Sequence, residues 1–236
     1  GKTTLMRMVN AMVTPTSGTV FVRGEDVAGE DPVRLRRSIG YVLQEGGLFP
    51  HRSIADNIAT VPRLEGATKQ ASRERALELL ELVGLDREMA DRYPAQLSGG
   101  QRQRVGVARA LANRADILLM DEPFGALDPI VRAELQCELK EIQRALGTTI
   151  LFVTHDVDEA FTLGDQVAVL STGGHIEQVG TPTDLLSSPA SPFVAEFVGA
   201  SRAARPVRVA GPGGLVVDDA GTPVGTLTRD EAGERP

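Results

Sequence analysis

The sequence has 236 residues, a length that accommodates one main domain and a smaller appendage. Its formal net charge is −7 and it has no run rich in Lys and Arg, which argues against a nucleic-acid-binding protein, because such proteins neutralise phosphates with a basic surface. The single cysteine, Cys137, excludes an intramolecular disulfide, and no apolar run approaches the roughly 20 residues of a membrane-spanning helix.

Short β-rich runs alternate with segments of helical periodicity along residues 1–198. This alternation predicts an α/β fold in which a mostly parallel sheet is flanked by helices. The helical region at about residues 53–112 is expected to form a subdomain. The predicted helices cover residues 2–12, 53–61, 70–83, 101–113, 129–146 and 156–163, and the predicted strands cover residues 19–23, 39–43, 117–120, 149–153 and 166–170.

The apolar periodicity also predicts which helix positions are buried. Within the helix over 129–146, Cys137 is interpreted as a small packing residue. The other positions expected to be buried are Ala71, Leu77, Leu80 and Val83 in the helix over 70–83, and Val105, Ala108 and Leu111 in the helix over 101–113.

The C-terminal part of the chain changes character. Residues 199–214 are rich in Gly, Pro, Ala and Arg and lack periodicity, which is typical of a linker. Two short β-rich runs then flank a turn sequence at 218–221, which predicts a hairpin. We therefore expect a main domain over 1–198, a linker over 199–214 and a short β appendage over 215–236.

Gly1-Lys2-Thr3-Thr4 begins the first predicted helix and matches the second half of the phosphate-binding pattern GxxxxGK[ST]. On this interpretation Lys2 contacts the β- and γ-phosphates of ATP and Thr3 is a ligand of Mg²⁺. The N–H groups of Gly1 to Thr4 would cradle phosphate oxygens. A GKT sequence at a helix start often arises by chance, so this prediction depends on the motifs downstream. Because the first half of the pattern is missing, we expect an N-terminally truncated domain from a longer protein.

The pentapeptide Leu97-Ser98-Gly99-Gly100-Gln101 precedes a helical run. Two residues without side chains let backbone N–H groups approach an anion, and the helix directs the positive end of its dipole at that anion. We therefore predict that Ser98, Gly99, Gly100 and Gln101 bind an anion.

An apolar run at 117–120 ends in Asp121 and Glu122, which describes a buried strand whose tip presents carboxylates to a metal ion and a water molecule. Neighbouring residues of a strand point in different directions, so two roles are expected. Asp121 would hold Mg²⁺, and Glu122 would orient, or accept a proton from, the water that attacks the γ-phosphate. The alternative is that both carboxylates only cap the next segment.

Two more polar residues stand at strand ends. His155 follows the strand over 149–153 and could reach the same crevice as Asp121, although it could also be an exposed residue at a helix start. Gln44 ends the strand over 39–43. His51 and His175 have no comparable setting and are interpreted as surface residues.

These motifs, together with Ala126-Leu127-Asp128, occur in the order seen in ATP-binding cassette (ABC) ATPases, a type of P-loop NTPase, and the resemblance covers about residues 1–198. It implies a homodimer, or a pair with another ATPase subunit, that holds two ATPs in composite sites. In such a dimer, Ser98 and Gly100 contact the γ-phosphate held by the opposite subunit, and Asp128 lies in the loop that crosses the seam. The same resemblance makes His155 a contact of the γ-phosphate and makes Gln44 a catalytic residue that senses the metal and the attacking water.

A finer resemblance lies in segments 41–44, 47–51, 56–58 and 121–129, which look like the ATPase subunits of bacterial importers for quaternary amines such as glycine betaine, choline and carnitine. It implies an ATPase on the cytoplasmic face of the plasma membrane, attached to a membrane permease and served by an extracytoplasmic solute-binding protein. Leu48, Phe49 and His51 are then candidate permease contacts, or else they only pack the loop. The hairpin from Leu215 resembles half of a CBS repeat.

Three alternatives stay open. The chain could serve another substrate, including amino acids or exported compounds. It could be a non-transport cassette that acts on DNA or ribosomes, although repair-type members insert long coiled coils between their nucleotide motifs and ribosomal types fuse two cassettes. It could also be a catalytically inactive binding module.

Overall fold

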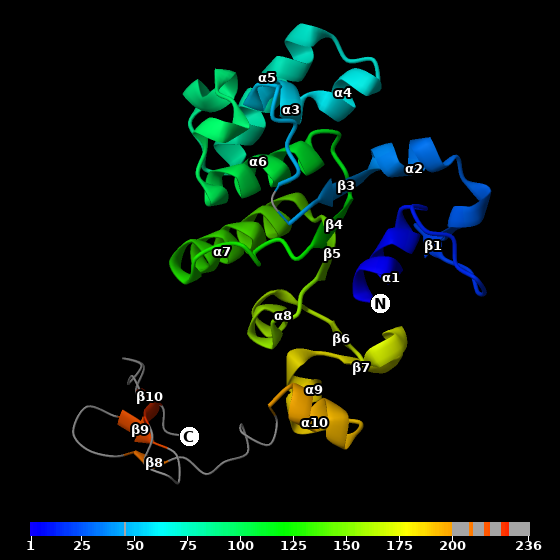
Figure 1. Ribbon diagram of the computed structural model, residues 1–236, viewed down its shortest axis with the longest axis vertical. Coiled ribbons are helices and arrows are strands. Elements are labelled where there is room, and N and C mark those ends of the chain that lie inside the picture. The colour runs from blue at the N-terminus through cyan, green and yellow to red at the C-terminus, as the bar shows by residue number, and fades with distance from the viewer. Residues whose placement is uncertain (45, 200–207, 210–214, 218–222, 227–236) are drawn as a thin grey trace. The chain divides into compact units, whose positions relative to one another are not determined.

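The computed structural model describes residues 1–44, 46–199, 208–209, 215–217 and 223–226 (Figure 1). The chain divides into two compact units. The first unit comprises Gly1–Leu163 and Thr172–Gly174, and the second comprises Gly164–Ser171 and His175–Pro236.

The first unit is built on a parallel sheet of three strands in the order β3-β4-β5 (Figure 1). These strands are β3 (Ile39–Val42), β4 (Ile117–Asp121) and β5 (Thr149–Val153), and the central β4 pairs in parallel with both neighbours. Leu118, Leu119 and Met120 of β4 are almost completely buried, as expected for a central strand covered on both faces. The predicted α/β fold with a parallel sheet is therefore confirmed.

Two hydrophobic cores lie against β4, because successive residues of a strand face opposite sides of the sheet. Leu118 and Met120 belong to the larger core, which includes residues of α5 (Lys69–Leu82), α6 (Gly99–Leu111) and α7 (Pro129–Leu146). Leu119 belongs to the second core, together with Met6 of α1 (Lys2–Val9) and Leu35 of α2 (Pro32–Ser38). The helices thus hold the strands in register from both sides.

The region predicted to be a helical subdomain contains α3 (Ile54–Ile58), α4 (Thr60–Leu64), α5, the 3-10 turns η2 (Arg87–Asp91) and η3 (Pro94–Gln96), and α6. Helices α3, α5 and α6 pack against one another at the top of Figure 1. Ser53, Thr68 and Ser98 each begin a helix by accepting a hydrogen bond from a first-turn backbone N–H. These starts are local, which is why the periodicity located α5 and α6. The predicted helix over 53–61 is divided in the structure, because α3 ends at Ile58 and α4 begins at Thr60.

The predicted buried face of α5 is only partly correct. Leu80 and Val83 are buried, but Ala71 is exposed and Leu77 is only half-buried. Ser72 is buried in place of Ala71. A polar residue can be buried there because its hydroxyl donates a hydrogen bond to the Thr68 carbonyl at 2.8 Å. On α6 the prediction is confirmed, because Val105, Ala108 and Leu111 are all buried.

Helix α7 has the predicted bounds and is followed, after β5, by α8 (Val157–Leu163). The prediction that Cys137 packs in the interior is wrong, because its side chain is exposed. The buried stripe of α7 follows Leu135, Leu139 and Ile142, and Cys137 lies off that stripe.

The N-terminal elements are shorter than predicted. Helix α1 ends at Val9, and Ala11 has a φ of +53°, which takes the backbone out of helical geometry. The predicted strand over 19–23 shrinks to β1 (Phe21–Val22), because Arg23 and Gly24 both have positive φ and turn the chain into β2 (Glu25–Asp26). The 3-10 turn η1 (Val27–Gly29) follows.

The second unit begins with β6 (Val167–Leu170), the predicted strand over 166–170. It pairs antiparallel with β7 (Ile176–Gly180) instead of adding a parallel strand, because the short connection through η4 (Thr172–Gly174) reverses the chain and a parallel crossover needs about a dozen residues. Helices α9 (Pro182–Ser187) and α10 (Pro192–Phe197) follow.

Three short strands lie near the C-terminus. The predicted hairpin pairing is present, since β9 (Leu215–Val217) and β10 (Pro223–Thr226) are antiparallel. A third strand, β8 (Arg208–Val209), lies within the segment 199–214 that was predicted to be a linker, and it pairs with β9. The predicted turn at 218–221 lies outside the described residues. Among the helices that the structure describes, none combines the length and the apolar character needed to cross a bilayer.

Candidate functional site

Most of the polar residues singled out in the sequence meet at one edge of the parallel sheet. Gln44 follows β3, Asp121 and Glu122 stand at the tip of β4, and His155 follows β5. Parallel strands place their carboxyl ends at the same edge, which is where open α/β sheets bind ligands. The predicted convergence of these residues is therefore a consequence of strand order.

The start of α1 lies at the same edge. Lys2 Nζ donates a hydrogen bond to the carbonyl of Thr154, just beyond β5, at 2.6 Å. Thr3 Oγ1 donates to Asp121 Oδ1 at 3.0 Å. These contacts join residues more than a hundred positions apart and direct the N-terminal end of α1 at the tips of β4 and β5. Gly1 and Thr4 are exposed beside them.

Thr3 and Asp121 supply oxygen atoms of the type that Mg²⁺ prefers. Within the described part of the chain, no group of three or more His, Cys, Asp or Glu side chains could hold a metal ion. Proteins usually bind Mg²⁺ through one or two side chains plus waters and phosphate oxygens. The Thr3–Asp121 pair fits that arrangement.

Glu122 has a strained backbone. Its φ is +47°, a left-handed conformation that costs a non-glycine residue about 1–2 kcal/mol. The turn is held on both sides, since the Glu122 N–H donates to the Val153 carbonyl at 2.9 Å and the Glu122 carbonyl accepts from the Gly125 N–H at 3.2 Å. The carboxylate is then brought to His155, whose Nδ1 lies 3.4 Å from Glu122 Oε1.

Gly125 is a site residue that the motif reading did not assign a role. A Cβ at this position would lie 3.3 Å from Gln44 Nε2 and 3.7 Å from Glu122 Oε2. The missing side chain therefore leaves a small space between the Gln44 amide and the Glu122 carboxylate. Its signal in the sequence was a glycine three residues after the second carboxylate.

The 97–101 pentapeptide forms the start of α6. Ser98 Oγ accepts from the Gln101 N–H at 3.2 Å, and Gln101 Oε1 accepts from the Ser98 N–H at 2.9 Å, a capping box. Gly99 is exposed, whereas Gly100 is buried, and a Cβ on it would lie 2.7 Å from Val131 Cγ1. Gly100 thus lets α6 pack closely on α7, a role that the sequence did not predict.

The first turn of α6 keeps donors available. Within the described residues, no hydrogen bond uses the N–H of Gly99 or Gly100. Free first-turn N–H groups at the positive end of a helix suit an anion. The N–H groups of Gly99 and Gly100 are therefore available to donate hydrogen bonds to a phosphate at the predicted position.

The Asp128 side chain caps the N-terminus of α7. Its Oδ1 accepts hydrogen bonds from the N–H groups of Ile130 at 3.2 Å and Val131 at 3.1 Å. The side chain is exposed. Leu127 lies next to the pentapeptide, since its Cδ2 is 3.6 Å from where a Cβ on Gly99 would be.

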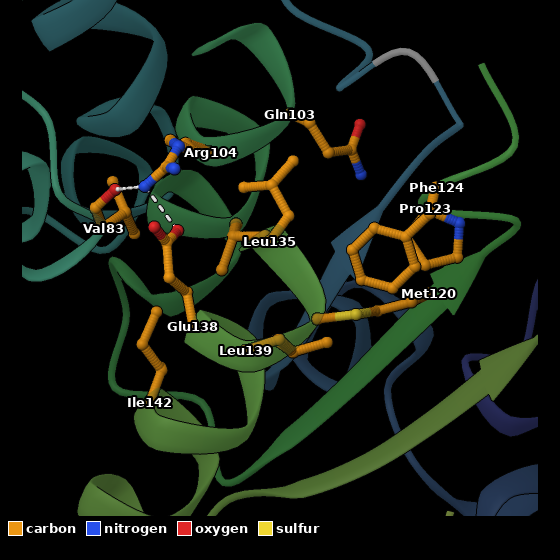
Figure 2. A pocket seen from close by; sticks show the side chains of 11 residues that line it. Val83, Gln103, Arg104, Met120, Pro123, Phe124, Leu135, Glu138, Leu139 and Ile142 are labelled. Atoms are coloured by element: carbon orange, nitrogen blue, oxygen red, sulfur yellow. Dashed lines mark hydrogen bonds and ion pairs between the residues drawn. The ribbon is translucent and has the colours of Figure 1, made fainter. Parts of the chain in front are cut away.

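A small cavity lies behind the turn that follows β4, between α6, α7 and β4 (Figure 2). Met120 and Phe124, which flank the Asp121-Glu122 pair, contribute to its mainly apolar wall. Gln103 also lines it, and its buried Nε2 has no hydrogen-bond partner among the described residues. At the rim, Arg104 pairs with Glu138. Such a lining suits side-chain packing and not a charged nucleotide.

Comparisons with known proteins identify the family of the chain. The family model described as "ABC transporter" matches residues 1–125. The glycine betaine/carnitine/choline transport ATP-binding protein OpuCA of Bacillus subtilis is 54% identical over 202 residues, which cover 86% of this chain and 53% of OpuCA. The osmoprotectant import ATP-binding protein OsmV of Salmonella typhimurium is 49% identical over 203 residues, which cover 86% of this chain and 53% of OsmV. The chain thus spans about half the length of these curated relatives.

A solved structure is also similar to this chain. The ATP-binding cassette MJ0796, in a dimeric post-hydrolysis state bound to ADP and Pi, superposes with a TM-score of 0.67 at 33% identity and covers 77% of this chain and 80% of its own. The fold is that of an ABC ATPase. By its matching family model, its relatives and its fold, the chain belongs to the ABC transporter family.

Proposed function

We propose that this chain is the ATP-hydrolysing part of a subunit that powers import of a quaternary ammonium osmoprotectant, such as glycine betaine, choline or carnitine. The observation that carries the proposal is the sheet edge, where Lys2 and Thr3 reach the tips of β5 and β4 beside the Glu122–His155 pair. The solute class is supported by the names of the relatives, which are osmoprotectant import subunits.

ATP would bind at the start of α1. The Lys2 ammonium is a compact positive charge suited to phosphate oxygens. The N–H groups of Gly1 to Thr4, which no hydrogen bond between described residues uses, add donors. Thr3 and Asp121 would hold Mg²⁺, which when bound offsets the charge on the phosphates. Gln44 is proposed as a further ligand from β3.

Hydrolysis would take place beside Glu122. The carboxylate is proposed to take a proton from the water whose oxygen attacks the γ-phosphorus, while the bond from that phosphorus to the β–γ bridging oxygen breaks. His155, 3.4 Å from Glu122, would contact the γ-phosphate. Gln44, on the other side of the Gly125 space, would orient the water.

Two copies are proposed to complete the site. Ser98, Gly99, Gly100 and Gln101 of one copy would face the γ-phosphate bound by the other, and Asp128 would lie at the seam. The dimeric state of the MJ0796 cassette supports this arrangement. A homodimer would then close two equivalent sites.

The segment after Gln44 is proposed to contact the permease. Leu48 packs against the larger core, so it supports the loop from inside. Phe49 and His51 are exposed, and their ring centres lie 6.2 Å apart. We place the subunit on the cytoplasmic face of the bacterial plasma membrane, attached through this permease, with a solute-binding protein outside.

The division into a cassette over 1–198, a linker over 199–214 and a CBS-like appendage over 215–236 is part of the same proposal. The antiparallel pairing of β9 with β10 supports a β appendage.

The test uses the full-length protein assembled with its permease and solute-binding protein in lipid vesicles. Glu122→Gln keeps the size of the side chain and removes the base, so ATP hydrolysis and uptake of labelled glycine betaine should fall at least about 100-fold. ATP-dependent dimerisation should persist. Undiminished hydrolysis in this variant would refute the role of Glu122.

The wild-type protein separates the alternatives. Uptake of amino acids in place of quaternary amines would indicate another substrate class. Hydrolysis that no solute stimulates would indicate a non-transport cassette, and a lack of hydrolysis would indicate an inactive module.

A further inference from the structure

A row of polar side chains on α7 contacts α8 and the residue that caps it. Three residues of α7, spaced four positions apart and therefore on one face of the helix, each have a partner there. The pairs are Arg132 with Asp156 at 3.4 Å, Gln136 with Glu159 at 3.1 Å and Lys140 with the Thr162 carbonyl at 2.6 Å. Helix α8 is thus held against α7 along its whole length.

Arg132 is the member of this row that reaches the sheet edge. Its Nη1 donates to Asp156 Oδ2, and its Nη2 donates to the Leu127 carbonyl at 3.3 Å. Leu127 lies in the turn that follows Glu122, and Asp156 comes directly after His155. One planar guanidinium therefore joins the turn after β4 to the turn after β5.

Asp156 uses its two carboxylate oxygens for different partners. Oδ1 accepts from the N–H groups of Asp158 at 3.0 Å and Glu159 at 3.2 Å and so caps the start of α8. Oδ2 is left for Arg132. The Asp156 N–H in turn donates to Thr154 Oγ1 at 3.0 Å. Hydrogen bonds therefore fix the backbone on the C-terminal side of His155.

The His155 ring itself has little packing to hold it, because its side chain is 68% exposed. Its place 3.4 Å from Glu122 Oε1 depends on the backbone that carries it. On the N-terminal side that backbone is held by Lys2, whose Nζ donates to the Thr154 carbonyl. A lysine that turns to a phosphate gives up this carbonyl, whereas both contacts of Arg132 are with groups of the protein.

We propose that Arg132 is a positioning residue, which keeps the His155 imidazole beside the Glu122 carboxylate by joining Leu127 to Asp156. This inference rests on the proposed function, in which both side chains act on the γ-phosphate and its water. Arg132 acts through the two turns and not on the nucleotide. Without it the two turns can separate, and a displacement of about 1 Å between reacting groups is enough to lower a rate strongly.

The test compares variants of the full-length protein, assembled with its permease and solute-binding protein in lipid vesicles. Arg132→Met keeps the length of the side chain and removes both hydrogen bonds. Asp156→Asn keeps one oxygen to cap α8 and replaces the acceptor of Arg132 by an NH₂ group. The matched control is Lys140→Met on the same face of α7, because Lys140 holds the far end of α8 and reaches neither turn.

We expect the kcat of ATP hydrolysis to fall about tenfold in Arg132→Met and severalfold in Asp156→Asn, with the KM for ATP unchanged. The double variant should lose no more than Arg132→Met, because both changes remove the same contact. Lys140→Met should melt at a lower temperature and keep the wild-type kcat. A wild-type kcat in Arg132→Met, additive losses in the double variant, an equal loss in Lys140→Met or a loss confined to KM would each overturn the inference.

A measurement without hydrolysis separates this inference from the proposed function. The full-length protein is labelled in its histidine rings, and the magnetic-resonance signal of His155 is assigned with His155→Gln. Lys2→Ala removes the other contact that holds the turn, and in this background Arg132→Met should shift the His155 signal whereas Lys140→Met should not.

An unmoved His155 signal in Lys2→Ala/Arg132→Met overturns the inference, whatever the kcat. Absence of hydrolysis in the wild-type protein refutes the proposed function, and the His155 signal then still decides whether Arg132 holds the turn. If Arg132→Met does not fold, Asp156→Asn takes its place in both measurements, and a wild-type kcat or an unmoved signal in Asp156→Asn overturns the inference.

Discussion

Replacing Asn57 by Ala should destabilise the first unit strongly. The change removes Asn57 Oδ1, which accepts the Phe49 N–H, and Asn57 Nδ2, which donates to three backbone carbonyls. These hydrogen bonds join α3 to the loop before it, which contains Phe49 and Arg52. Each hydrogen bond contributes about 0.5–1.5 kcal/mol net, and water can reach part of the exposed loop, so a loss of about 2–4 kcal/mol is expected.

In a unit of this size each kcal/mol lowers the melting temperature by about 2–4 °C. The variant should therefore melt about 5–15 °C below wild type in a circular-dichroism scan. Denaturant unfolding gives the free energy directly, provided that the slope against denaturant is unchanged.

The matched control is Asn113→Ala, because Asn113 is half-buried and donates a single hydrogen bond, to the Arg37 carbonyl at 3.0 Å. It should cost only about 1 kcal/mol. If Asn57→Ala costs no more than Asn113→Ala, the four contacts do not act as an anchor and the reasoning about the loop fails.

Three other changes probe the site and the surface. Gly125→Ala adds a methyl group between Gln44 and Glu122, so kcat should fall about tenfold while the melting temperature stays the same; an unchanged kcat would contradict the assigned space. Thr3→Val removes the hydroxyl proposed as a magnesium ligand and should raise the Mg²⁺ concentration needed for nucleotide binding, measured by titration, whereas Thr3→Ser should behave like wild type. The hydrogen bond from Arg23 lowers the pKa of Asp116 in the folded protein. The ionised Asp116 therefore stabilises the fold at pH values above the pKa that Asp116 has in the unfolded chain, and this stabilisation is lost as the pH falls through the pKa that it has in the folded protein. Asp116→Asn should flatten the loss of stability below about pH 4 in denaturant unfolding, by a small amount because the side chain is exposed.

Local signals located the elements of the fold. The predicted bounds of α7 match the structure because Asp128 caps the helix, Pro129 begins it and Gly147, with a φ of +62°, ends it. Strand β4 could be predicted from its apolar run and terminal carboxylates. Local signals fail where the pairing of a strand depends on its partner. Strand β6 is an example, because its antiparallel pairing with β7 depends on the short connection between the two strands and not on the residues of β6.

The position of the residues at the sheet edge was predictable for the same reason. Lys2, Asp121, Glu122 and His155 each mark an element end, and parallel strand order brings element ends together. The sequence did not indicate that Gly125 separates Gln44 from Glu122, because that depends on how two loops approach.

The sequence by itself thus determined the family, the order of helices and strands and the residues at the sheet edge, since caps, apolar periods and motifs are written within a few neighbouring positions. Only the tertiary structure decided which face of α5 is buried, that Gly100 makes room for Val131, and that Arg109 holds the Gly46–Gly47 carbonyls. These contacts join residues about 30 to 60 positions apart. A backbone carbonyl as a partner leaves no mark in the sequence, because every residue carries one.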